Sequence, residues 1–158
     1  MFNFLKSKPR RMAGWLAICI TTAGAAEGLR TTAYRDPVGI PTVCFGETKG
    51  VKMGDRYTVD QCKDMFAARL LEFNIGVDRC VVARMSEERR AAVVSFTYNV
   101  GVRASCQSTF VRKLNAGDPK ACDELRNWVY ATKAGVRIKL PGLVKRREEE
   151  RKLCMMGH

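Results

Sequence analysis

Residues 27–46 read EGLRTTAYRDPVGIPTVCFG, and this stretch differs in character from the sequence on either side of it. It is rich in Gly, Pro and Thr, and its β-branched residues come in short bursts, which is typical of strands joined by turns. The turn at Asp36-Pro37-Val38-Gly39 predicts a short strand over 40–45. We therefore expect a small antiparallel sheet in a β-containing lobe at about residues 27–58.

Helical patterns take over after this lobe. Thr58 and Gln61 form a capping-box pattern, and apolar residues follow at helical spacing, which predicts a connecting helix over about 59–80. Capping residues then predict four further helices, over about 86–101, 108–117, 118–130 and 143–153, within a helical lobe at about residues 81–158. The expected fold is α+β, mainly α, with two lobes joined by a long helix.

The segment before the lobes has the order of an export signal. Four basic residues precede a charge-free run over 12–26, and they are Lys6, Lys8, Arg10 and Arg11. The run has 15 residues, fewer than the roughly 17–25 needed to span a bilayer. One reading is a buried first helix with a basic leader. We favour residues 1–26 as a weak export or anchor segment that merges into the first helix.

The charge of the chain limits which partners it can bind, and its cysteines indicate the redox state of its compartment. The chain has 28 Lys and Arg against 16 Asp and Glu, a net charge of +12, which attracts polyanions such as nucleic acid, anionic lipid or acidic cell-wall polymer. The basic residues are spread over every segment without a nucleic-acid reading motif, so nucleic acid is not favoured.

Seven cysteines without a C-x-x-C pair, and a single histidine, do not predict a zinc site. With the export-like segment, they favour a disulfide framework in an oxidising compartment.

Two carboxylates stand apart from the other acidic residues. Most acids lie among Arg and Lys, as over 148–150, where a solvated face is expected. Glu27 follows the apolar run, where a first helix would end, so we expect its carboxyl to be partly desolvated, as suits a general acid. Asp36 lies in a turn, where backbone donors and water favour the ionised form. Such a pair suits glycoside hydrolysis, although carboxylates near turns also occur in chains without this activity.

The residues around this pair resemble the active-site segment of the phage-type lysozymes, glycoside hydrolase family 24. That family carries a Glu, an Asp nine residues later and a Thr six residues after that, and Glu27, Asp36 and Thr42 have these intervals. The resemblance covers about residue 20 to the end. It continues through VSFTYNVG at 94–101, Ser108-Thr109, RKLNAGD at 112–118, Trp128, and GLV at 142–144 with Arg146-Arg147.

The resemblance implies a lysozyme-like fold and a muramidase that cleaves the β-1,4 bond between N-acetylmuramic acid and N-acetylglucosamine. Glu27 would be the general acid, and Asp36 and Thr42 would hold the attacking water on the opposite face of the sugar, which predicts inversion. The alternative for Thr42 is an ordinary strand residue. No metal or organic cofactor is implied.

The resemblance also bears on the cleft around these residues. Tyr98, Asn99 and Ser108 match positions that line the cleft of the family, although they could equally be core residues. Glu47 departs from the family, in which many members have His after the Gly of the hairpin. A structural ion pair at that position is therefore in doubt.

For the cysteines, the resemblance implies a bridge between Cys80 and Cys154, and we join Cys106 to Cys122 as a second pair. Cys44 lies two residues beyond Thr42, and we favour it as a small buried hydrophobic residue. The alternative is a redox latch, in which a bridge from Cys44 to another cysteine, with Cys19 as a candidate, distorts the cleft until thiol exchange releases it.

The expected partner is peptidoglycan, whose peptide carboxylates would attract a basic protein. We expect a monomer that associates transiently with the host inner membrane through residues 12–26 and acts in the periplasm. The alternative is residence in the host cytoplasm until a holin releases the protein. The alternative function is a basic membrane-active or nucleic-acid-binding protein without catalysis, which would not depend on Glu27.

Overall fold

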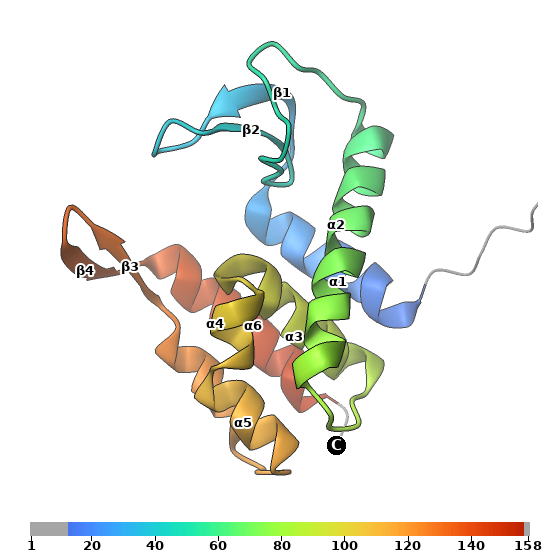
Figure 1. Cartoon of the computed structure of the whole chain (residues 1–158), viewed down its shortest axis with the longest axis vertical. Helices are drawn as coiled ribbons and strands as arrows, with labels where there is room; N and C mark the ends of the chain where they lie inside the picture. Colours follow the sequence, from blue (N-terminus) through green and yellow to red (C-terminus); the bar gives the residue numbers. More distant parts are fainter. Residues whose placement is uncertain (1–12, 157–158) are drawn as a thin grey trace, which may run out of the picture.

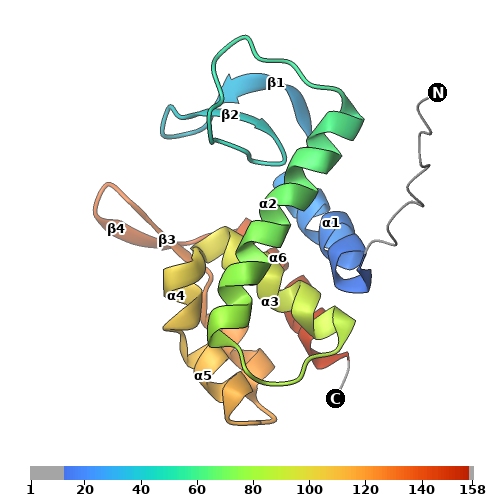
Figure 2. The ribbon, with the colours of Figure 1, turned by 45° about the vertical axis from the view of Figure 1, so that its right-hand side comes forward.

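Two lobes are joined by one long helix, α2, which runs along both of them (Figures 1 and 2). The computed structural model describes residues 13–156. Its elements are α1 (Gly14–Glu27), β1 (Arg30–Arg35), β2 (Pro41–Cys44), α2 (Val59–Cys80), α3 (Glu87–Val100), α4 (Val102–Cys106), α5 (Thr109–Asn115), the 3-10 helix η1 (Ala121–Asn127), β3 (Tyr130–Lys133), β4 (Val136–Lys139) and α6 (Pro141–Met155). The expected α+β fold, mainly α, is confirmed.

The smaller lobe is built around the antiparallel pair β1–β2. Tyr34 pairs with Thr42 across the sheet, and the register shifts between Arg30 and Tyr34. The turn that joins the two strands is closed by Asp36, whose carboxylate accepts the backbone N–H groups of Val38 and Ile40 at 2.9 Å each. An Asp at the start of a turn commonly bonds the backbone in this way. The predicted sheet is thus present.

Helix α2 begins and ends at the residues that the sequence predicts. The backbone N–H of Thr58 donates to Oε1 of Gln61 at 2.8 Å, and the backbone N–H of Gln61 donates to Oγ1 of Thr58 at 3.1 Å. This reciprocal capping box satisfies two N–H groups that have no partner within the helix. The helix buries Cys62, Phe66 and Leu70.

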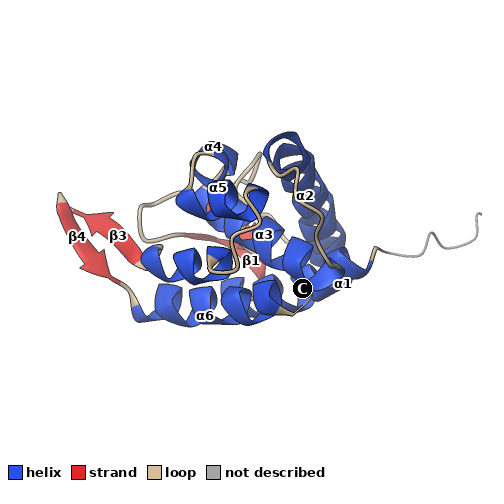
Figure 3. Ribbon diagram, turned by 90° about the horizontal axis from the view of Figure 1, so that it is seen from below, coloured by secondary structure: helices blue, strands red, loops and turns tan. Residues whose placement is uncertain are grey.

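Helix α3 lies at the centre of the larger lobe. Every residue over 91–97 is buried, and α1, α2 and α6 all pack against this helix. Figure 3 shows α6 running below α3. Because other helices surround α3, its apolar residues lie on more than one face and do not form a single stripe. The predicted caps at Ser86 and Ser108 are present, since each side chain accepts a backbone N–H three residues later.

One predicted helix is wrong in part. The segment 118–130 forms only the short η1, and the chain then turns through the hairpin β3–β4. Ala134 and Gly135, between these strands, have φ of 49° and 77°. Two consecutive positive φ values are the mark of a type I′ hairpin turn, but that turn usually carries Asn or Gly at its first central position. Ala134 gave no such signal in the sequence. Helix α4 was also not predicted.

The disulfides differ from those expected. Cys44 bonds Cys62, Cys80 bonds Cys106, and Cys122 bonds Cys154, with Cα–Cα distances of 5.0, 5.6 and 5.8 Å. The predicted pairs Cys80–Cys154 and Cys106–Cys122 are therefore wrong. Cys80 ends α2 beside α4, which carries Cys106, whereas Cys122 lies on η1, which packs against α6 and its Cys154.

Cys44 is buried, as expected, but it is bonded and not a free thiol. Among the described residues only Cys19, on α1, is a free cysteine, and it is buried. The basic leader over 1–11 lies outside the described residues. Within residues 13–156, no helix is both long and apolar enough to cross a bilayer.

Candidate active site

Glu27 is the last residue of α1, and its carboxylate lies between the two lobes. Gly28, with φ of 73°, turns the chain out of the helix and toward β1. The Glu27 side chain is 23% exposed, and Nη1 of Arg146 on α6 donates to its Oε1. The partial burial expected for this carboxyl is present. Its cationic partner was not expected.

The turn after β2 is held against this carboxylate. A Cβ atom at Gly46 would lie 3.3 Å from Oε2 of Glu27, and Gly46 has φ of +85°, which side chains rarely adopt. The backbone conformation therefore favours glycine here, and a Cβ would also make a tight contact with the carboxylate. The neighbouring carbonyl of Phe45 accepts the hydroxyl of Tyr98 at 2.9 Å, which ties the same turn to α3.

The arginine that pairs with Glu27 belongs to a buried cluster of charged side chains on α6. Arg146 also reaches Oε1 of Glu150 at 3.3 Å, and Arg147 lies 3.1 Å from the other oxygen of that carboxylate. Ser95 on α3 donates to Glu150 at 2.8 Å. Burial raises the pKa of the Glu150 carboxyl, although the two arginines oppose the shift. The expectation of a solvated face over 148–150 is thus wrong for Glu150, which is 3% exposed, because helical spacing turns it inward with Arg146 and Arg147.

Asp36 and Thr42 are linked through the peptide groups of Ile40. The N–H of Ile40 donates to Asp36, and its carbonyl accepts the Thr42 hydroxyl at 2.9 Å. The backbone donors expected around Asp36 are therefore present. Thr42 is only 4% exposed. Its hydroxyl, which donates to Ile40, keeps lone pairs that can accept a hydrogen bond from water.

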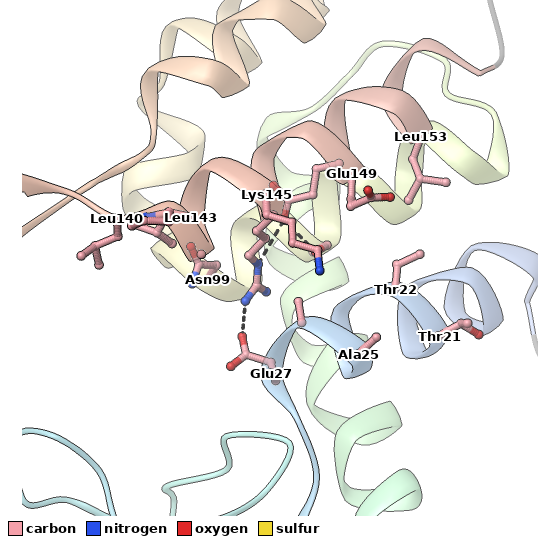
Figure 4. Close-up of a pocket in the computed structure, with 16 residues that line it drawn as sticks. Thr21, Thr22, Ala25, Glu27, Asn99, Leu140, Leu143, Lys145, Glu149 and Leu153 are labelled. Carbon is pink, nitrogen blue, oxygen red and sulfur yellow. Dashed lines mark hydrogen bonds and ion pairs between the residues drawn. The ribbon is translucent and has the colours of Figure 1, made fainter.

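Two cavities meet at Glu27 and Asn99. The first, of about 450 Å³, lies between the lobes and is lined by Glu27, Gly46, Glu47, Thr48, Arg69, Phe73, Tyr98 and Asn99. The second, of about 850 Å³, lies between α1 and α6, and Figure 4 shows its side chains, with the ion pair of Glu27 at one edge. Volumes of this size suit ligand sites. A carboxylate between two lobes and open to a cavity can transfer a proton to a bound molecule.

The structure brings only some of the predicted residues to these cavities. Tyr98 and Asn99 line the interlobe cavity with Glu27. Asp36 and Thr42 line neither cavity. Ser108 is buried, and its hydroxyl both caps α5 and donates to the carbonyl of Ser105 at 2.6 Å. The contacts of Ser108 are therefore structural.

Glu47 forms an ion pair in spite of its departure from the expected histidine. Arg69 on α2 donates to its two carboxylate oxygens at 3.1 and 2.6 Å, and two backbone N–H groups donate to Oε1. Partial burial alone would raise the pKa of Glu47, but these hydrogen bonds outweigh burial and lower the pKa below its ordinary value. The hairpin turn is thus tied to the connecting helix inside the interlobe cavity.

Sequence reasoning missed the role of Arg146. Its partner Glu27 is 119 residues away in the chain, so no local spacing connects them. A signal did exist in the spacing of Arg146, Arg147 and Glu150 on one helix face. Among the described residues there is no cluster of three or more His, Cys, Asp or Glu side chains that could hold a metal ion.

Comparison with known proteins places this geometry in context. The family described as Phage lysozyme matches residues 24–150. The SAR-endolysin of Bacteriophage PS119 is 41% identical over 133 residues, covering 83% of this chain and 77% of the relative. The SAR-endolysin of Pseudomonas phage phiKMV is 36% identical over 149 residues, covering 94% and 92%. A solved endolysin from Escherichia coli O157:H7 phage FAHEc1 superposes with a TM-score of 0.83 at 29% identity, covering 96% of this chain and 95% of that one.

Proposed function

This chain belongs to the phage lysozyme family, and we propose that Glu27 is the general acid of its reaction. The protein is an endolysin, a glycoside hydrolase that cleaves the β-1,4 bond between N-acetylmuramic acid and N-acetylglucosamine in peptidoglycan and so lyses the host cell. The observation that carries the proposal is the partly buried carboxylate of Glu27 at the junction of the two cavities.

Glu27 donates a proton to the glycosidic oxygen as the bond to the sugar breaks. The carboxylate that remains is negatively charged, and Arg146 already lies against it. A cation fixed where charge develops stabilises the transition state without having to reorganise. Arg146 is in turn held by Glu150, so we propose it as the positioning residue for the acid.

Asp36 and Thr42 hold the attacking water. The hydrogen bonds through Ile40 fix the two side chains relative to each other. In this arrangement the Asp36 carboxylate accepts a proton from the water and the Thr42 hydroxyl orients it, on the face of the sugar opposite Glu27. The proposed outcome is inversion at the anomeric carbon.

Tyr98 and Asn99 are proposed to contact the glycan, because they line the interlobe cavity beside Glu27. The net charge of +12 supports binding to a wall polymer with peptide carboxylates. The proposed active form is a monomer, because the two lobes that line the cavity belong to one chain.

We further propose that residues 12–26 associate weakly with the inner membrane before the enzyme acts in the periplasm. The names of the SAR-endolysin relatives support this order. Most of these residues form α1, which packs against α3 and ends at Glu27. The same residues therefore either associate with the membrane or pack against α3 as helix α1, which positions Glu27. Residence in the cytoplasm until a holin acts is the alternative, and fractionation of a carboxy-terminally tagged chain before lysis separates the two.

The test of the proposed acid is the Glu27→Gln variant. An amide keeps the size of the side chain but cannot donate the required proton, so clearing of a suspension of purified cell walls should fall at least about 100-fold. The matched control is Glu148→Gln, which removes a carboxylate of α6 that forms an ion pair with Arg126 and lines neither cavity. The control should clear walls like the wild type. Clearing by Glu27→Gln at the wild-type rate would refute the assignment.

A further inference from the structure

The hairpin β3–β4 projects from the larger lobe on the same side as the β1–β2 sheet, one from each lobe (Figures 1 and 2). Nearly all of its residues over 130–139 are exposed. An isolated two-stranded hairpin is only marginally stable in water. This one is closed at its base by a bond from the N–H of Leu140 to the carbonyl of Val129 at 2.9 Å. Leu140 also lines the larger of the two cavities that contain Glu27.

The register of the hairpin divides its side chains between two faces. Tyr130 pairs with Lys139 and Thr132 pairs with Arg137, and directly opposed residues in an antiparallel pair share a face. One face therefore carries an aromatic ring, a hydroxyl and two cations. The opposite face carries Ala131, Ile138, Lys133 and Val136.

The polar face of the hairpin carries groups that can bind carboxylates. The guanidinium of Arg137 lies 3.9 Å from the centroid of the Tyr130 ring, and stacking of this kind fixes the plane of the group while leaving its edge N–H donors open. Residues 128–147 contain no Asp or Glu. Lys139 is two residues further along β4, so its side chain leaves the strand on the same face, about 7 Å along the backbone from that of Arg137. Two cations on one face, with no acidic residue in the segment, can attract negatively charged groups.

We propose that the polar face of the β3–β4 hairpin binds the free carboxylates of the peptide stems of peptidoglycan, with Arg137 and Lys139 as the specificity-determining residues. The inference rests on the proposed cleavage of peptidoglycan, because the stems are part of that polymer. Arg137 forms a two-pronged contact with one carboxylate. Lys139 attracts the second as a point charge, and Thr132, directly across from Arg137, adds a hydroxyl donor.

The experiment compares purified peptidoglycan with the same material after its stem carboxylates have been converted to amides, which removes the charge but keeps the peptides. We expect the wild type to cleave the native material with a higher kcat/KM, through a lower KM. In the double variant R137A/K139A this native-to-amidated ratio should fall about fivefold to tenfold, as expected for the loss of two exposed charge contacts. Thermal unfolding of both proteins checks that the hairpin change leaves the body folded.

The matched control is K63A/R79A, which removes the same charge from exposed positions on α2 and should keep the wild-type ratio. Arg137→Lys keeps the charge but loses the planar fork, so it should restore only part of the ratio. Equal ratios for R137A/K139A and the wild type would overturn the proposal. So would an unchanged ratio together with lost binding to phosphatidylglycerol vesicles, which would assign the hairpin to a membrane surface. Failure of the wild type to cleave either substrate would instead refute the muramidase function itself.

Discussion

Thr42 is a buried residue whose proposed role depends on one oxygen atom. Its hydroxyl donates to the carbonyl of Ile40, so in the proposed role it accepts a hydrogen bond from the attacking water. Thr42→Ala removes this acceptor, and we expect kcat to fall about 100-fold or more with little change in KM, because the water is then no longer held. Thr42→Ser keeps the hydroxyl and is the control. Full activity of Thr42→Ala in a wall-clearing assay would mean that another group holds the water.

The ion pair of Glu47 and Arg69 predicts a dependence of stability on pH. The folded state lowers the pKa of Glu47 from 4.5, so its contribution is complete above pH 4.5 and is lost as the pH falls through the lower folded-state value. Glu47→Gln removes this contribution. We expect the free energy of unfolding to drop by about 1 kcal/mol at pH 7, and the gap from the wild type to close below pH 4.5. Urea unfolding across pH 3–7 measures it, and a gap that widens in acid would contradict the ion-pair account.

The site residues and their contacts were predictable to different degrees. The intervals between Glu27, Asp36 and Thr42 are local and could be read directly from the sequence. The contact of Arg146 with Glu27 is created only when the fold brings α6 to the end of α1, so no short-range pattern contains it. The same holds for the contact of Arg69 with Glu47, which lies on the hairpin turn.

At the scale of elements, helix α2 approaches α4 closely at Gly76. A Cβ there would lie 2.7 Å from Cγ2 of Val102. Gly76→Ala gains about 1 kcal/mol of helix propensity but forces these helices apart, and overpacking costs about 1–3 kcal/mol. We expect a net loss of about 1 kcal/mol in the free energy of unfolding. Gly142→Ala, where a Cβ meets nothing within 4 Å, is the control, and a stabilised Gly76→Ala variant would show that the contact yields easily.

Elements with strong local signals were the predictable ones. The capping box fixed the start of α2, and Ser86 and Ser108 fixed the starts of α3 and α5. The β3–β4 hairpin was missed because its turn depends on Ala134 in a left-handed conformation. Disulfide pairing follows from which elements pack together, and spacing along the chain does not reveal that packing.

At the scale of the whole molecule, two of the three disulfides tie a lobe to the connecting helix α2, and the third lies within the larger lobe. The Cys44–Cys62 bridge ties the end of β2 to α2, close in sequence to Thr42. Burial raises the pKa of the free Cys19 thiol to about 12, so it holds little thiolate while α1 is packed. We therefore propose that this bridge is structural in the folded enzyme and that exchange with Cys19 does not occur there.

Cys44→Ser tests this proposal. The bridge closes a loop of 18 residues, and its removal should cost about 3 kcal/mol of stability while the timing of lysis stays unchanged. Peptide mapping without reduction checks the three pairs. Earlier lysis by Cys44→Ser that requires Cys19 would show instead that the two cysteines form a redox latch.

In the mechanism proposed for the whole enzyme, Glu27 supplies one proton, and one water held by Asp36 and Thr42 attacks, so that the glycan is cleaved between its two sugars. The measurement that tests it most directly is the identity and anomeric form of the new chain end, followed by NMR and mass spectrometry during digestion of purified peptidoglycan. We predict reducing N-acetylmuramic acid that is first released as the α-anomer by the wild type, and no such end with Glu27→Gln. Release of the β-anomer, of reducing N-acetylglucosamine, or of any new chain end by Glu27→Gln at the wild-type rate would contradict the account.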